Sequence, residues 1–234
     1  MLSIYKRELT AYFTSTLGYI FMAVFLALSG AAVWVMNFFF ATTSFGNYFF
    51  VMIIFFVILV PILTMRLLSE ERHSKTEQIL LTAPVSLFDI VFAKFLAAFT
   101  LFEITFALSM INLIPVSRYG NVNLAEIISN FIGVSCVAMS LIAIGLFISS
   151  LTESQFIAAI GSIAVILALF LVGTFSSSIP SDFLRVAVKW FSVLDRYVNF
   201  RHGIFDFSSI VYYISISAVF MFLTVRVYEK RRWS

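Results

Sequence analysis

The sequence predicts an all-α integral membrane protein, a single domain over residues 1–234 with six transmembrane helices. The first reason is composition: 62% of the residues are hydrophobic, 12% are charged and the mean hydropathy is +1.04, whereas soluble domains carry about 25% charged residues. The second is the length of the apolar runs, since a membrane-spanning helix needs about 20 apolar residues. The third is that these runs leave no stretch long enough for a soluble domain. The expected spans are residues 16–40, 48–68, 87–115, 127–151, 156–175 and 208–228.

The segment before the first span, residues 1–14, is expected to form a short helix that lies in the membrane interface. Leu2, Tyr5 and Leu9 recur at helical spacing with basic residues between them, a pattern typical of interfacial helices. The other interpretation is a merely polar N-terminus. A cleavable signal peptide does not fit, because the following apolar run continues through "VWVMNFFF", past a signal's usual core of about 7 to 15 residues.

The basic residues predict the orientation, because Lys and Arg concentrate in loops on the cytoplasmic side of a membrane. If both termini are cytoplasmic, ten of the fifteen basic residues lie on the inner side. This bias favours a multi-pass protein with both ends inside. The five basic residues left on the outer side are Arg118, Arg185, Lys189, Arg196 and Arg201.

A dense cluster of charge, "EERHSKTEQILLTAPVS" at residues 70–86, predicts a separate short helix. Ser74 and Glu77 have the S-x-x-E spacing of a capping box, and Pro84 ends the helix. About eight residues is fewer than the 12 to 15 at which an isolated helix becomes marginal in water, so this helix needs packing partners. We expect its charged half to dock on another protein and Ile79–Leu81 to pack on the membrane helices. The alternative is a capped turn without a partner.

The spans on either side of this cluster carry their own signals. Pro61, near the end of the second span, is expected to bend or locally open the helix. Ser86 and Asp89 have the S-x-x-D spacing that predicts the start of the third span. Between the fourth and fifth spans, "SSLTESQ" is expected to form a tight helical hairpin turn.

The chain lacks the residue patterns that catalytic and metal sites need. It contains no G-x-x-x-x-G-K-[ST] phosphate loop, so we expect no ATP site in it. His73 and His202 lie outside the spans, which argues against an intramembrane serine protease. The single cysteine, Cys136, and the scattered carboxylates show no metal-ligand spacing. We therefore expect no catalytic, cofactor or metal site.

Glu103 is the ionisable residue that falls clearly in the middle of a span. Ionisable residues inside a membrane are costly and mark substrate paths or bonds to neighbouring helices, and both roles remain open for Glu103. Ion-driven transporters use ionisable residues inside the membrane as relays, and a single carboxylate is too few for such a relay. We therefore expect the energy source to be a separate protein.

The stretch "EERHSKTEQILLTAPVSLFDIVFAKFLA" resembles the loop after the second span of type-2 ATP-binding-cassette (ABC) exporter permeases. "ISSLTESQFIAAI" looks like the turn between the fourth and fifth spans in that family, and the C-terminal part from "DRYVNFRHGIF" is similar to its gliding-motility-type subgroup. One departure is Ser74-Lys75, where the family commonly has Gly before the Thr-Glu pair. The residues that carry the resemblance in the loop are Glu70, Glu71, Thr76, Glu77, Leu80, Leu81, Pro84 and Lys94.

This resemblance implies a permease subunit that has no ATPase site of its own. It implies two cytoplasmic ABC ATPase subunits, which hold ATP and Mg, and a second permease subunit that is either another copy or a relative. The implied location is the bacterial cytoplasmic (inner) membrane, with the lipid bilayer as surroundings and no nucleic acid as partner. The residues expected to couple to the ATPase are Glu70, Glu71, Arg72, Thr76, Glu77, Leu80 and Leu81.

The resemblance also implies a route, because the family's substrate passes between the second and fifth spans of paired subunits. The candidate path residues are Phe55, Glu103, Ser162 and Ile163. Apolar walls suit an apolar or lipid-like cargo that is moved outward. The alternative is that the phenylalanines simply face lipid, since membrane spans are apolar for that reason. The alternative function is a membrane scaffold that transmits ATPase motion to an envelope machine without passing cargo.

The segment before the last span is expected to form an amphipathic helix on the outer side. "SDFLRVAVKWFSVLDRYV" places apolar residues on one helical stripe, and it places Arg185, Lys189, Ser192 and Arg196 on another. Cations near an anionic surface contribute about 1 kcal/mol each. We expect Arg185, Lys189 and Arg196 to contact anionic headgroups or an anionic cargo. The alternative is a solvated polar face without a function.

Overall fold

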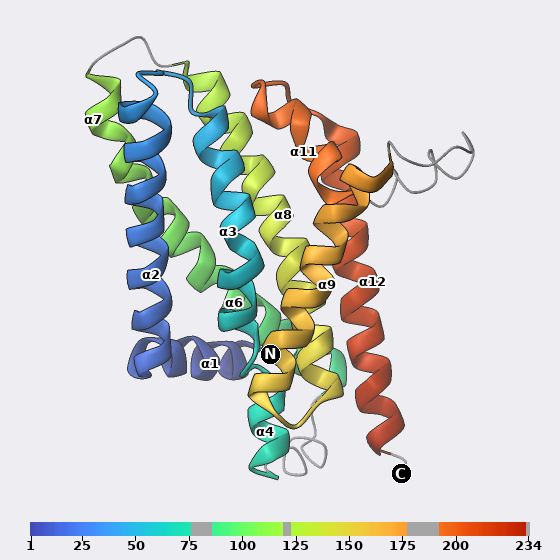
Figure 1. Cartoon of the computed structure of the whole chain (residues 1–234). Helices are drawn as coiled ribbons and strands as arrows, with labels where there is room; N and C mark the ends of the chain where they lie inside the picture. The colour runs from blue at the N-terminus through green and yellow to red at the C-terminus, as the bar shows by residue number, and fades with distance from the viewer. Residues whose placement is uncertain (76–85, 119–122, 177–191, 233–234) are drawn as a thin grey trace.

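The computed structural model describes residues 1–75, 86–118, 123–176 and 192–232 of the chain. Within these ranges every regular element is a helix, and six of the helices are long and apolar enough to cross a membrane. The all-α, six-span prediction is therefore confirmed. Figure 1 shows these long helices running side by side between the two ends of the molecule.

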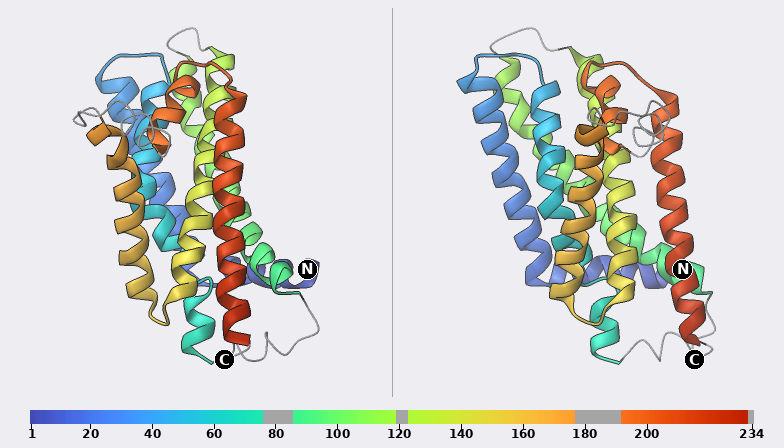
Figure 2. Two further views of the ribbon diagram at one scale, coloured as in Figure 1. Left: turned by 90° about the vertical axis from the view of Figure 1, so that its right-hand side faces the viewer. Right: turned by 45° about the vertical axis from the view of Figure 1, so that its right-hand side comes forward.

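The helices begin and end close to the predicted residues. In order they are α1 (Leu2–Thr14), α2 (Thr16–Val33), the π-helix η1 (Trp34–Phe39), α3 (Gly46–Thr64), α4 (Ser69–His73), α6 (Leu87–Ser109), the 3-10 helix η2 (Met110–Leu113), α7 (Ile114–Ser117), α8 (Leu124–Leu151), α9 (Gln155–Ser176), α11 (Val193–Arg201) and α12 (Phe207–Arg232). Helix α1 lies across the end of the bundle, turned sharply from α2 (Figure 1). Both termini and α4 lie at this same end in every view (Figures 1 and 2).

Helix α8 lies at the centre of the bundle, in contact with α3, α9, α11 and α12. Small residues on α8 allow neighbouring backbones to approach closely, as is common in membrane helix packing. A Cβ added at Gly145 would lie 2.3 Å from Thr64 Oγ1 on α3. A Cβ added at Gly133 would lie 2.7 Å from the Phe200 ring on α11. The two glycines therefore fix how α3 and α11 seat against α8.

A cluster of phenylalanines fills the space between α2, α3 and α6. Phe25, Phe56, Phe102 and Phe106 are fully buried. The ring of Phe102 packs edge-on against both Phe25 and Phe56, with centroids 5.7 and 5.2 Å apart, a favourable aromatic geometry. These phenylalanines form the core of a single protomer and do not face lipid.

Two of the predicted local signals lie near helix ends on either side of α4. Pro61 lies within α3, near its end at Thr64. A turn over residues 65–68 then separates α3 from α4. Ser86 caps α6, because its hydroxyl accepts a hydrogen bond from the Asp89 backbone N–H at 3.1 Å. The predicted start of the third span is confirmed.

Two predicted helix signals act differently in the structure. Ser74 ends α4 as its C-cap, and its hydroxyl donates to the Glu70 carbonyl at 2.9 Å; the other half of the expected capping box, Glu77, lies outside the described residues. Ser192 has an extended backbone and caps α11 through the Asp195 N–H. The predicted continuous helix through Ser192 is therefore wrong, since this short side chain starts a new helix there.

The end of the bundle opposite α1 is tied together by hydrogen bonds to the beginning of α3, which we call the α3 clamp. Glu126, in the first turn of α8, accepts from Ser44 Oγ at 2.7 Å and from the Gly46 N–H at 2.8 Å. Arg201, at the end of α11, donates to Asn47 Oδ1 at 2.5 Å. The beginning of α3 is thus bonded to both α8 and α11.

Candidate functional site

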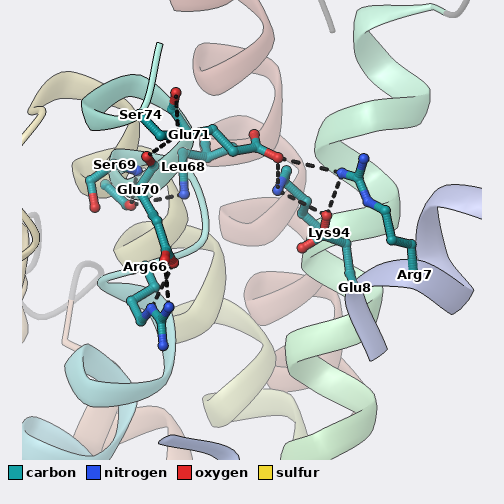
Figure 3. Close-up of polar contacts among 10 residues, drawn as sticks. Arg7, Glu8, Arg66, Leu68, Ser69, Glu70, Glu71, Ser74 and Lys94 are labelled. Atoms are coloured by element: carbon teal, nitrogen blue, oxygen red, sulfur yellow. Dashed lines mark hydrogen bonds and ion pairs between the residues drawn. The ribbon is translucent and has the colours of Figure 1, made fainter. Parts of the chain in front are cut away.

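A buried lysine lies at the centre of the most charged region of the described chain. Lys94, in the second turn of α6, has a side chain that is only 2% exposed. Its Nζ lies 2.8 Å from Glu71 Oε1 on α4 and 3.2 Å from Glu8 Oε1 on α1. Figure 3 shows the lysine between these carboxylates. A lysine is almost never fully buried unless it is paired, so both partners are needed to hold it there.

Arg7 completes the group, which we call the charge cluster: Arg7, Glu8, Glu71 and Lys94. Its Nη2 lies 2.7 Å from Glu8 Oε1 and 3.4 Å from Glu71 Oε1. The cluster contains two cations and two carboxylates, so its formal charges balance. Its members come from three separate helices, α1, α4 and α6. The cluster therefore joins the helix across the end of the bundle to α4 and to a long apolar helix.

Electrostatics keep the cluster's carboxylate on α1 ionised. Burial disfavours the charged form of Glu8, but Lys94 and Arg7 together outweigh burial and lower the pKa of Glu8 below its ordinary value of 4.5. Opposite charges at these distances favour the ionised form of a carboxyl. Glu8 is therefore a carboxylate at neutral pH.

Two tyrosines fasten α1 to its neighbours beside the cluster. The Tyr5 hydroxyl donates to Thr100 Oγ1 on α6 at 3.1 Å, and the Tyr12 hydroxyl donates to the Leu63 carbonyl on α3 at 3.0 Å. Helix α1 is thus held by hydrogen bonds as well as by charge.

Glu70, in the first turn of α4, forms a separate ion pair with Arg66, which lies just before that helix. It accepts two hydrogen bonds from Arg66, from Nε at 2.6 Å and from Nη2 at 2.5 Å. Both side chains are partly exposed, at 33% for Arg66 and 44% for Glu70. A pair of this kind at i,i+4 contributes about 0.3 to 0.5 kcal/mol, so it orients the two side chains more than it stabilises the fold.

The remaining charge on α4 reaches the turn between α8 and α9. Arg72 donates to the Leu151 carbonyl at 3.0 Å and lies 2.9 Å from Glu153. Nearby, Ser149 Oγ accepts from the backbone N–H groups of Leu68 and Ser69, at 3.2 and 3.1 Å. Helix α4 is thus bonded to the α8–α9 turn on one side and to the charge cluster on the other.

Three of the seven predicted coupling residues are described, and all three bond within this chain. Glu70 pairs with Arg66, Glu71 with Lys94 and Arg72 with Glu153. Glu71 points into the molecule (Figure 3), not outward as a group that enters a partner's groove would. The other four, Thr76, Glu77, Leu80 and Leu81, lie outside the described residues.

Sequence reasoning did not assign Arg7 or Glu8 to this site, and it used Lys94 only as part of a resemblance. A signal was present, because a lysine inside an apolar span needs a buried carboxylate to pair with. The sequence did not show which carboxylates, since Glu8 and Glu71 lie 86 and 23 residues away along the chain.

The predicted path residues lie on three helices, α3, α6 and α9, and differ in exposure. Ser162 on α9 is fully buried within the protomer, so it does not line a surface that a partner or cargo could reach. Phe55 and Ile163 are half-buried. Glu103 lies beside Ser135 and Cys136 of α8, and Figure 1 shows its helix, α6, passing behind the bundle while α9 lies in front.

Different residues of the same two helices face outward. On α3 these are Ile54 and Ile58, and on α9 they include Ile160 and Leu167. The outward apolar surface of α3 and α9 thus includes these exposed residues beside the half-buried Phe55 and Ile163. A span that is apolar all round gives no periodic signal from which to choose its exposed face.

Of Arg185, Lys189 and Arg196, the three basic residues predicted to lie on one amphipathic helix, Arg196 is described and lies on α11. Its guanidinium lies 5.3 Å from the centroid of the Tyr212 ring and donates to Ser208 Oγ at 3.4 Å. Both partners belong to the last long helix, α12. Arg185 and Lys189 lie outside the described residues.

Comparison with known proteins gives a family match over most of the chain. A protein-family model described as "ABC-2 family transporter protein" matches residues 36–195, which is 160 of the 234 residues. The match includes α3, α4, α6, α8 and α9. No curated protein and no solved structure matches the chain.

Proposed function

The chain belongs to the ABC-2 family of transporter proteins and is a permease subunit of an ABC transporter; from this premise we propose that it exports an apolar or lipid-like cargo and is driven through α4. The observation that carries the proposal is the charge cluster, which connects α4 to α1 and α6 through Lys94. A partner that displaces α4 also displaces the helices bonded to it.

The proposed driving partner is a separate cytoplasmic ABC ATPase in two copies, which binds ATP and Mg. In this proposal its docking surface is the exposed tip of α4, His73 to Lys75, together with the predicted contacts Thr76, Glu77, Leu80 and Leu81. Glu70, Glu71 and Arg72 then act as the internal half of the connection, because their charges are bonded within the permease.

Motion would leave α4 in two directions. Through Glu71, Lys94 and Glu8 it reaches α6 and α1. Through Arg72 and Ser149 it reaches the α8–α9 turn. Interactions between buried, mutually satisfied charges hold a defined geometry, so these contacts are suited to transmit a displacement of a few ångströms.

The proposed cargo route lies between α3 and α9 of two permease subunits, either two copies or a copy and a relative. Its support is the apolar outward surface of these helices, including Ile54, Ile58 and Ile160. An apolar wall without charged groups suits a lipid-like cargo. The resemblance to gliding-motility-type permeases is part of the same proposal.

The proposed location is the bacterial inner membrane, with both termini in the cytoplasm. Two observations support it. The termini and α4 share one end of the bundle (Figure 2), and that end holds ten of the fifteen basic residues of the sequence under this orientation.

The docking proposal is tested by a charge reversal at the tip of α4. The Lys75→Glu variant, co-expressed with the ATPase, should lose most of the co-purifying ATPase, because the exposed tip is expected to contact it. The matched control is Lys230→Glu, an exposed cation on α12 at the same end. Equal ATPase recovery in both variants would exclude the tip as the docking surface.

The coupling proposal is tested in vesicles that contain the permease and the ATPase. Glu71→Gln should retain the ATPase and its hydrolysis, while ATP-dependent movement of a labelled lipid falls at least tenfold. The control is Glu229→Gln, an exposed carboxylate on α12. If the wild-type complex hydrolyses ATP but moves no lipid under any condition, the scaffold function replaces the exporter.

A further inference from the structure

A cavity of about 230 Å³ lies where α1 turns into α2. It opens between these two helices, the end of α3 and the beginning of α4. Its volume is below the range of about 300 to 1,000 Å³ that holds a whole drug-sized ligand, so it suits part of a larger molecule. Its lining is Glu8, Ala11, Tyr12, Ser15, Leu17, Gly18, Phe21, Ile62, Leu63, Arg66, Leu67 and Glu70.

The lining changes from charged to apolar along the helices. Glu8, Arg66 and Glu70 lie on the side of α1 and α4, whereas Phe21 and Ile62 lie further along α2 and α3. Helix α1 runs across the bundle at the level where α2 begins (Figure 1). A cavity graded in this way, at that level, matches a membrane lipid with its headgroup at the charges and its chains along the apolar side.

The charges select the kind of headgroup. Arg66 presents a guanidinium, which binds a phosphate through paired N–H donors. Glu70 presents a carboxylate, which accepts hydrogen bonds from a primary ammonium, whereas Glu8 is already paired with Lys94 and Arg7. A purely anionic headgroup would bring no ammonium to Glu70 and would place its own charge near that carboxylate, so it would be disfavoured.

The Arg66–Glu70 pair can exchange its contacts for those of a lipid. Both side chains are partly exposed, at 33% and 44%, and exposed ion pairs of this kind are weak. A phosphate on Arg66 and an ammonium on Glu70 would replace one pair by two. In Figure 3 the pair lies apart from the charge cluster, whose bonds would remain in place.

We propose that this cavity binds a zwitterionic phospholipid with a primary amine headgroup, of the phosphatidylethanolamine class, from the leaflet on the side of α1. This site goes beyond the transport function, because it lies within one protomer, on α1, α2 and α3. The proposal does not depend on which cargo the protein moves.

The test uses native mass spectrometry on the full chain after exchange into a micelle with equal amounts of phosphatidylethanolamine, phosphatidylcholine and phosphatidylglycerol. The wild-type chain should retain phosphatidylethanolamine at least fivefold over either of the others. The Arg66→Gln, Glu70→Gln double variant should retain the three lipids equally. Its matched control is Arg226→Gln, Glu229→Gln, which removes a comparable ion pair on α12 at 2.6 Å and should keep the wild-type preference.

A second variant tests the cavity without removing a charge. Ala11→Trp fills the space from an exposed position of α1 and should abolish the retained lipid. Preference for phosphatidylglycerol, equal retention of all three lipids by the wild-type chain, or unchanged retention in Ala11→Trp would each overturn the proposal. None of these outcomes depends on ATP, so they are separate from a failure of the export function.

Discussion

At the scale of single residues, Lys94 shows how an apolar helix accommodates a cation. Its ammonium group has lost water almost completely, and two carboxylates from other helices replace it. Buried ion pairs of this kind are weak evidence for added stability, yet removal of one partner is costly because the other charge is left without compensation. The cluster should therefore behave as a unit when it is mutated.

We predict that Lys94→Met lowers the free energy of unfolding by about 3 to 5 kcal/mol, the usual cost of breaking a buried ion pair. The methionine fills a similar volume but leaves Glu8 and Glu71 facing each other without Lys94. Thermal unfolding in detergent measures the loss, and Lys230→Met on the exposed surface of α12 is the control. The triple variant with Glu8→Gln and Glu71→Gln should recover part of the loss, and equal unfolding temperatures for Lys94→Met and the control would contradict the prediction.

The cluster also predicts a dependence on acid. The pKa of Glu8 is lowered in the folded chain, so its contribution to stability is present above the unfolded value of 4.5 and is lost as the pH falls through the folded pKa. Arg7 keeps its charge over this range, because its hydrogen bond to Glu8 raises an already high pKa.

The difference in unfolding temperature between the wild-type chain and Glu8→Gln should therefore shrink as the pH falls below about 4.5. Unfolding curves at steps of half a pH unit measure it. A difference that grows on acidification would mean that Glu8 is protonated in the folded chain, contrary to its pairing with Lys94.

At the scale of elements, the close contact between α3 and α8 depends on a glycine, Gly145, at the point of contact. Gly145 lets the Thr64 hydroxyl approach the α8 backbone, and Thr64 itself donates to the Val60 carbonyl at 3.0 Å. The same stretch of α3 precedes the turn into α4. The seat of α3 on α8 therefore sets where α4 begins.

We predict that Gly145→Ala destabilises the chain by about 1 to 3 kcal/mol, the usual cost of overpacking a well-packed contact. The added methyl group would lie 2.3 Å from Thr64 Oγ1 and 2.9 Å from Thr64 Cβ. The control is Gly30→Ala on α2, where a Cβ meets nothing within 4 Å and helix propensity favours alanine by about 1 kcal/mol. Equal unfolding temperatures for the two variants would show that α3 moves aside without cost.

Helix ends could be predicted from the sequence only where the cap is local. Ser86 and Asp89 were recognised because a capping bond joins residues three apart. Ser74 and Ser192 show the limit, because the same residue type ends one helix and begins another. Which role a serine takes depends on the backbone around it, and short motifs do not specify that.

At the scale of the whole molecule, the six spans were predictable because burial in a bilayer requires long apolar runs. The charge cluster was not, since it joins Glu8, Glu71 and Lys94 from three helices whose packing no local pattern reveals. The exposed positions of α3 and α9, such as Ile54 and Ile160, could not be told from their apolar neighbours in the sequence. Ser162 is polar and was expected on a path, yet it is buried against the protomer itself.

The proposed orientation predicts which ends of the bundle are accessible from outside the cell. In a Cys136→Ala background, Arg118→Cys should react with a membrane-impermeant maleimide in intact cells, because it lies at the end opposite the termini. Lys230→Cys, near the C-terminus, should react only after permeabilisation. Both positions are exposed, so reaction of Lys230→Cys in intact cells would reverse the assigned orientation.

The α3 clamp fixes the beginning of α3, so this helix can tilt about that end. Its 19 residues span about 28 Å at 1.5 Å per residue, with Glu126 and Arg201 gripping one end and α4 hanging from the other. A tilt of about 5° around the clamp would displace the α4 end by roughly 2 to 3 Å over this length, while the gripped end stays in place. A displacement of α4 would accordingly widen or narrow the bundle mainly at the end where the termini lie. The opposite end, held by the clamp, would keep its packing.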